Sequence, residues 1–147
     1  MAEAQMISVT PELLGELLMN SGYRAEHRQD ASGLPVIASA TGGISFNIRL
    51  GNRALAPAEG FLDFTYLTVI KIDGDFTLER VNEWNRTKRF ARLHRSDDFL
   101  VVDMDVIAAG GVTERHLRAG LELWDRLLQE LVGWLRGETP AGAANAA

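Results

Sequence analysis

A long apolar seam near the C-terminus constrains the fold more than any other feature of this sequence. Gly110-Gly111 ends the preceding strand pattern, Thr113 is placed to cap a helix, and helical spacing continues to about Arg136. The seam alternates spacings of four and three residues through Leu117, Leu121, Trp124, Leu128, Leu131 and Leu135, and Leu123, Leu127 and Trp134 widen it. Such a helix is roughly 35 Å long. We expect it to cover a whole sheet face or to extend past the sheet to a partner.

The segment from Phe61 to Ile72 is the most apolar part of the chain and has strand periodicity. One face carries Leu62, Phe64, Tyr66, Ile70 and Ile72, and the other face still carries Leu67 and Val69. A strand that is apolar on both faces is usually central in a sheet or buried at an interface. We therefore expect this strand to lie inside the sheet, with Leu67 and Val69 available for a contact.

The N-terminal half predicts a helix followed by antiparallel strands. Thr10 can cap a helix that Asn20 to Gly22 ends, and a strand with one polar face begins at Tyr23. The segments 34–41 and 44–50 flank Gly42-Gly43, a pair that tolerates the positive φ angles of a two-residue hairpin turn. That turn sets Ile37 opposite Ile48 and Ser39 opposite Phe46.

The second half predicts a helix over 76–88, capped at Asp75 or Thr77, and then a hairpin formed by 89–95 and 99–107. A two-residue loop at Asp97-Asp98 places Leu93 opposite Val102, Ala91 opposite Met104 and Arg92 opposite Asp103. The predicted fold class is α+β, an antiparallel sheet with the element order α-β-β-β-(β)-α-β-β-α.

Composition narrows the class of protein. The chain has 147 residues, a formal net charge of −5 and no cysteine. Its length suits one domain, expected over 1–137, and the Pro, Gly and Ala residues of 138–147 indicate a disordered C-terminal tail. The charge speaks against a general affinity for nucleic acid or an anionic membrane, and the absence of thiols removes disulfide and thiolate chemistry. Without a signal peptide or an apolar spanning segment, we expect a cytoplasmic protein.

Residues that could support catalysis have structural explanations. Asp103 and Asp105 lie about 7 Å apart on one strand face, a separation found in inverting carboxylate pairs, but Arg92 can neutralise Asp103 and the Gly110-Gly111 turn can donate to Asp105. The three histidines, His27, His94 and His116, fall on separate elements without ligands at metal-site spacing. We expect no catalytic residue, no cofactor and no metal.

The segment from Arg86 to Arg95 holds six basic residues and no acid, against the acidic balance of the chain. In one interpretation, Arg86, Arg89 and Arg92 contact an anionic partner group. In the other, Arg86, Lys88 and Arg89 complement the C-terminal end of the preceding helix, and Arg92 pairs across the hairpin. The sequence leaves both open.

Several short motifs in order resemble one family. These are Val81-Asn82-Glu83-Trp84-Asn85, the basic strand after it, Val102-Asp103-Met104-Asp105, Gly110-Gly111-Val112-Thr113, and the helix with Leu121 and Trp124. Together they resemble the YbjN-like family of bacterial proteins, over about Ile7 to Leu135. The resemblance implies a regulator of sensory transduction with a fold similar to type III secretion chaperones, and it implies no reaction.

We expect a non-enzymatic regulatory protein that is a homodimer and binds a protein partner. The predicted partner or dimer contacts are Leu67, Val69, Trp124, Leu128 and Trp134. One alternative is a small dimeric chaperone that holds an extended segment of a secreted protein, and another is an enzyme that uses Asp103, Asp105 and His94.

Overall fold

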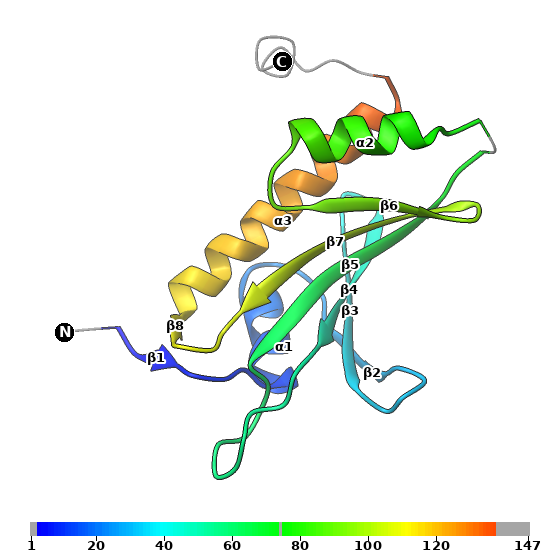
Figure 1. Ribbon diagram of the computed structural model, residues 1–147. Helices are drawn as coiled ribbons and strands as arrows, with labels where there is room; N and C mark the ends of the chain where they lie inside the picture. The colour runs from blue at the N-terminus through cyan, green and yellow to red at the C-terminus, as the bar shows by residue number, and fades with distance from the viewer. Residues whose placement is uncertain (1–2, 74, 138–147) are drawn as a thin grey trace.

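The computed structural model describes residues 3–73 and 75–137. The described chain is α+β, with three helices, a six-stranded antiparallel sheet and a small two-stranded sheet (Figure 1). The helices are α1 (Pro11–Asn20), α2 (Leu78–Thr87) and α3 (Glu114–Leu135). The strands are β1 (Gln5–Met6), β2 (Glu26–Gln29), β3 (Pro35–Thr41), β4 (Ile44–Leu50), β5 (Asp63–Lys71), β6 (Arg92–Ser96), β7 (Phe99–Ile107) and β8 (Val112–Thr113). The predicted fold class is confirmed at this level, and the predicted tail 138–147 lies outside the described residues.

The six-stranded sheet has the order β2-β3-β4-β5-β7-β6, so β5 is an interior strand as its two apolar faces predict. Both hairpin registers are confirmed along the observed ladders, whereas the expected Ala91–Met104 pair is not formed because β6 begins at Arg92. Ile37 pairs with Ile48 across β3 and β4, and Arg92 pairs with Asp103 across β6 and β7. The second hairpin closes with a two-residue loop in which Asp97 adopts a φ of 51°. Asp is one of the residues that tolerates this conformation, which explains why the loop works without glycine.

Two short strands were not predicted. β1 and β8 pair through Gln5 with Thr113 and Met6 with Val112, at the point where α3 begins. Strands of two residues leave no periodicity in the sequence, so only the three-dimensional pairing reveals them. Thr113 also caps α3, because its hydroxyl accepts a hydrogen bond from the His116 amide at 3.0 Å.

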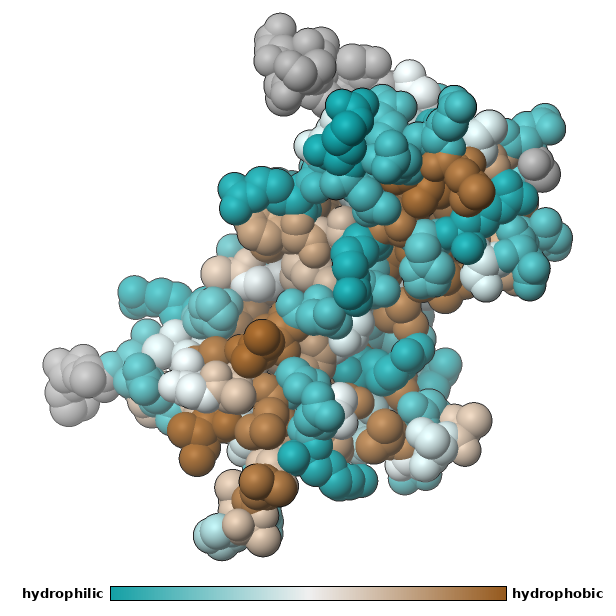
Figure 2. All heavy atoms as spheres, in the orientation of Figure 1, coloured by the Kyte–Doolittle hydropathy of each residue, from teal (hydrophilic) through white to brown (hydrophobic). Residues whose placement is uncertain are grey.

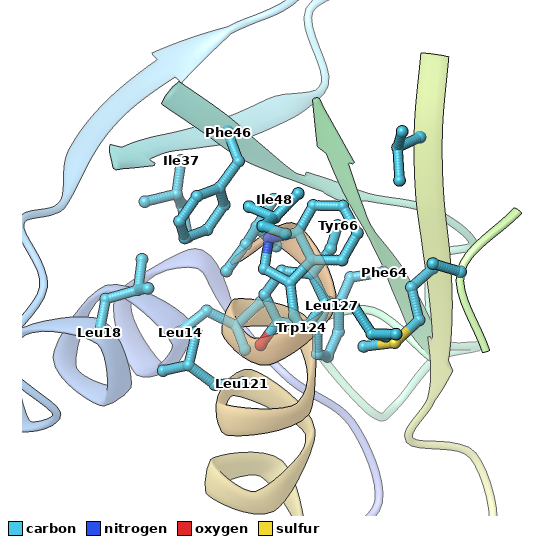
Figure 3. Close-up of a cluster of buried hydrophobic side chains, with 14 of the residues drawn as sticks. Leu14, Leu18, Ile37, Phe46, Ile48, Phe64, Tyr66, Leu121, Trp124 and Leu127 are labelled. Carbon is cyan, nitrogen blue, oxygen red and sulfur yellow. The ribbon is translucent and has the colours of Figure 1, made fainter. Parts of the chain in front are cut away.

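The main core lies between one face of the sheet and the helices α1 and α3 (Figure 3). Tyr66 of β5 stacks on Trp124 of α3 with ring centroids 5.4 Å apart, and Phe46 of β4 meets the edge of the same indole. Buried residues of α3 extend from Leu117 to Gly133. The long helix therefore covers the sheet along most of its length, which is the first of the two roles expected for it.

Burial corrects two predicted contact residues. Trp124 and Leu128 are completely buried, with none of their surface exposed, because the seam of α3 faces the core of its own chain. Their prediction as partner or dimer contacts is therefore wrong for the folded chain. Spacing shows that a helix has an apolar face, but it does not show what covers that face.

A second aromatic cluster joins α2 to the C-terminal half of α3. Trp134 is half-buried against Trp84 and Phe76, with ring centroids 5.3 and 5.9 Å away. The Arg80 guanidinium lies 4.6 Å from the Trp134 ring and donates to the Trp134 carbonyl at 3.1 Å. The side chain of Trp134, another predicted contact, is therefore partly covered by α2 and by Phe76 just before it.

Candidate functional site

The face of the sheet opposite α1 and α3 carries several of the predicted functional side chains. We call it the open face. It presents alternate residues of the four strands from β4 to β6, which are Ser45, Asn47, Arg49, Thr65, Leu67, Val69, Arg92, His94, Phe99, Val101, Asp103 and Asp105. All of them are exposed or half-buried, whereas their neighbours on the other face, such as Tyr66 and Val102, are buried.

Four apolar residues gather at one part of the open face. Val69 pairs with Val101, Leu67 lies two residues before Val69 on β5, and Phe99 lies two residues before Val101 on β7. Val69 is 54% exposed and Phe99 is 43% exposed. We call Leu67, Val69, Phe99 and Val101 the sheet patch. It contains two residues predicted as partner contacts and two that sequence reasoning missed, although alternation along β7 places Phe99 and Val101 on the face of Asp103.

Charged residues occupy the neighbouring part of the open face. The Arg92 guanidinium lies 2.7 Å from Asp103 Oδ1 and 3.1 Å from Asp105 Oδ2. The hydrogen bond to Asp103, and then the charges of both carboxylates, raise the pKa of Arg92. Thr65 donates to Asp105 at 2.7 Å, so Asp105 is held by Thr65 and Arg92 and not by the Gly110-Gly111 turn. With both carboxylates paired to one guanidinium, neither is placed as a free acid or base.

The β4–β5 ladder is incomplete. It runs from the Leu50–Phe64 pair to the Asn47–Leu67 pair and stops there. Residues 44–46 of β4 and 68–71 of β5 thus have no ladder partner across this gap within the described chain. The Thr68 hydroxyl donates to the Ser45 carbonyl at 2.6 Å across this gap.

Two hollows lie beside this opening. The first, of about 240 Å³, is lined in part by Arg24 and Arg28, and the second, of about 460 Å³, reaches Val132 and Leu135 of α3. Both are also lined by three residues of the gap, Ser45, Thr68 and Val69. The hollows and the sheet patch therefore meet at Val69.

The basic segment is divided between paired and unpaired side chains. Lys88 bonds Glu130 of α3 at 2.7 Å, so it pairs with α3 and not with the end of α2. Arg92 pairs with Asp103 across the hairpin, as the second interpretation of the basic segment predicts, and it also pairs with Asp105. Arg86 and Arg89 are exposed, and neither belongs to an ion pair within the described residues. Their prediction as anionic contacts stays a prediction.

The histidines lie apart, as their positions in the sequence indicate. His27 is on β2, His94 is on β6 and His116 is in the first turn of α3. Among residues 3–73 and 75–137, no group of three His, Asp or Glu side chains is arranged to hold a metal ion. No helix in that part of the chain is long and apolar enough to cross a membrane.

Comparison with known proteins adds one finding. A family model described as "putative bacterial sensory transduction regulator" matches residues 10–136. The chain belongs to this family, YbjN. No curated protein and no solved structure matches the chain at a significant level. The YbjN assignment confirms the resemblance found in the sequence, and the family is described as a regulator and not as an enzyme.

The motif that first indicated YbjN has a structural role in this chain. Trp84 Nε1 donates to the Ala91 carbonyl at 3.2 Å. The Asn85 side-chain amide donates to the Leu93 carbonyl at 2.8 Å and accepts from the Leu93 amide at 2.9 Å. Asn85 thus occupies backbone groups of β6, the last strand of the sheet. Trp84 and Asn85 of the YbjN motif thus fix the edge of the sheet.

Proposed function

We propose that this YbjN-family chain is a non-catalytic regulator that acts by binding an extended segment of a partner protein at the open face. The observation that carries the proposal is the position of the sheet patch. Leu67 and Val69 belong to an interior strand, yet the described helices cover only its other face. A segment lying on this face would cover the patch and remove its apolar surface from water.

The β4–β5 opening supports an extended segment as the occupant. Strand residues without a ladder partner present backbone donors and acceptors to a third strand.

The same opening favours a second function, that of a dedicated chaperone. A fold related to type III secretion chaperones, implied by the resemblance, would hold one secreted protein in an unfolded state against this surface. The two functions differ in whether the partner is folded before it binds. A regulator binds a folded protein through one exposed segment, whereas a chaperone binds a chain that has not folded.

Val69→Arg tests the proposal, because it places a charge in the sheet patch at a side chain that is 54% exposed. Met19→Arg, at a side chain of α1 that is 57% exposed, is the matched control away from the open face. Proteins that co-purify from the native cell are identified by mass spectrometry for both variants and the wild type. We expect one partner with the wild type and Met19→Arg and its loss with Val69→Arg. Equal recovery with Val69→Arg would contradict the proposal.

Hydrogen exchange distinguishes the two functions once the partner is known. We expect amides of residues 44–46 and 68–71 to become protected when the partner is added. If the folded partner gives this protection, the chain is a regulator. If only the unfolded partner gives it, the chain is a chaperone.

A further inference from the structure

Phe90 combines an exposed aromatic side chain with a strained backbone conformation. It is 56% exposed and has a φ of 76°, a left-handed conformation that bulky L-residues rarely adopt. The Ala91 amide donates to the Arg89 carbonyl at 2.9 Å, which closes a three-residue γ-turn with Phe90 at its centre. A γ-turn with positive central φ is the rarer and more strained form, and glycine would fit it without strain.

The surrounding structure holds this turn firmly. Trp84 Nε1 bonds the Ala91 carbonyl directly after the turn, and the Asn85 amide bonds both backbone groups of Leu93. Strained conformations persist where neighbouring contacts fix them, and they are concentrated at binding and catalytic sites. The folded chain therefore exposes an aromatic ring at a position where glycine would give less backbone strain.

Unpaired positive charge lies beside the ring. The Arg89 guanidinium is 4.7 Å from the centre of the Phe90 ring, and Arg86 lies on the last turn of α2. Neither arginine belongs to an ion pair among the described residues, whereas the neighbouring Lys88 and Arg92 do. We call Arg86, Arg89 and Phe90 the basic platform. Beside it is an open hollow of about 600 Å³, lined in part by Phe90, Arg92 and His94.

We propose that the basic platform binds an acidic peptide segment of a protein partner, with Arg86 and Arg89 pairing its carboxylates and Phe90 packing against an apolar side chain. Arginine pairs carboxylates through two parallel hydrogen bonds, which suits a segment with a few acids. The chain carries a net charge of −5 and places Asp97, Asp98 and Asp103 on the adjoining hairpin, so a long polyanion such as nucleic acid is repelled. A short acidic segment carries far fewer charges, so its repulsion by the chain is smaller while it still pairs with the two guanidinium groups.

This inference rests on the proposed function only in requiring that the chain binds protein, since the platform is a different surface from the sheet patch. Arg92 connects the two, because it lines the hollow beside the platform and pairs in register with Asp103 of the open face. A partner long enough to use both surfaces would bind them together.

The test uses a phage-displayed library of random linear peptides selected on the full chain. We expect enriched peptides to carry Asp and Glu with at least one apolar residue, and to bind more weakly as salt is added. The double variant Arg86→Glu/Arg89→Glu and the variant Phe90→Gly should each weaken binding by about tenfold or more. Arg126→Glu, a charge reversal at an exposed residue of α3, is the control and should bind as the wild type does.

Thermal unfolding completes the test, because it separates a binding role of Phe90 from a structural one. We expect Phe90→Gly to melt at the wild-type temperature or above it, since glycine relieves the strained φ. A marked drop in its melting temperature would overturn the inference, and so would acidic peptides that bind the double variant normally. If enriched peptides lose binding with Val69→Arg and keep it with Phe90→Gly, the proposed function stands and the platform is wrong.

Discussion

Asp125 of α3 joins three hydrogen bonds from different parts of the chain. Its carboxylate accepts from the Tyr23 hydroxyl, from Thr41 Oγ1 at 2.9 Å and from Gln129 Nε2 at 3.3 Å. Tyr23 precedes β2 and Thr41 ends β3, so this one side chain fixes the middle of α3 against the beginning of the sheet. No sequence pattern predicted this network, because Tyr23 and Thr41 are far from Asp125 in the chain and none of the three is unusual in its local context.

The network predicts an unusual titration of Tyr23. Burial, and then the hydrogen bond to Asp125, raise the pKa of Tyr23 from 10.0 to about 12. Because the folded pKa is above the unfolded one, the contribution of this network to stability is complete below pH 10 and is lost between pH 10 and about pH 12. The chain has two tyrosines, so phenolate absorbance in a Tyr66→Phe background reports Tyr23 alone. We expect Asp125→Asn to lower the pKa of Tyr23, and titration near pH 10 without that substitution would contradict the network.

Elements with a strong local signal were predicted well. The Gly42-Gly43 turn fixes the β3–β4 register, and Thr113 fixes where α3 begins. The start of α2 was left open between Asp75 and Thr77, and Thr77 is the cap. The γ-turn at Phe90 is different, because nothing in the local sequence indicates a positive φ at a phenylalanine. That conformation follows from tertiary hydrogen bonds made by Trp84 and Asn85, which no local pattern contains.

The edge of β6 depends on Asn85. An edge strand exposes backbone groups that can pair with other chains, and the Asn85 amide occupies both groups of Leu93. We expect Asn85→Ala to destabilise the fold by about 1–3 kcal/mol, because the two backbone groups lose their partner while they are partly buried. Urea unfolding measures the change. Asn82→Ala, on the exposed side of the same helix, should stay within about 0.5 kcal/mol of the wild type, and an equally small effect at Asn85 would refute this role.

The division of the molecule into one covered and one open sheet face explains which of the predicted contact residues remain accessible. Strand alternation placed Leu67 and Val69 on a face of their own, and the structure leaves that face without a helix. The seam of α3 has an equally strong pattern, but Trp124 and Leu128 are covered by the sheet of the same chain. Which apolar surface remains open depends on the whole packing arrangement, and this information is not contained in any single element.

Homodimerisation, expected from the sequence, would use an exposed apolar surface away from the sheet patch, because the proposed function assigns that patch to a segment of a partner protein. Other exposed apolar side chains come from three segments that meet at one end of the sheet: Ile7 is 64% exposed, Leu55 84% and Ile107 68%. These segments meet because Val9 bonds the Phe61 backbone and the Ala108 amide donates to the Leu62 carbonyl at 2.7 Å. We call these three residues the end patch; Figure 2 shows hydrophobic side chains over β1 and the long loop below the sheet.

We propose that the homodimer forms through the end patch, and two matched substitutions test this assignment. Leu55→Arg places a charge in the end patch and Val69→Arg places the same charge in the sheet patch, each at a side chain more than half exposed. By light scattering at micromolar concentration, we expect the mass of two chains for the wild type and Val69→Arg, and of one chain for Leu55→Arg. A monomeric Val69→Arg would instead make the open face the dimer interface. The partner segment would then have to compete with a second copy of the chain for the same surface.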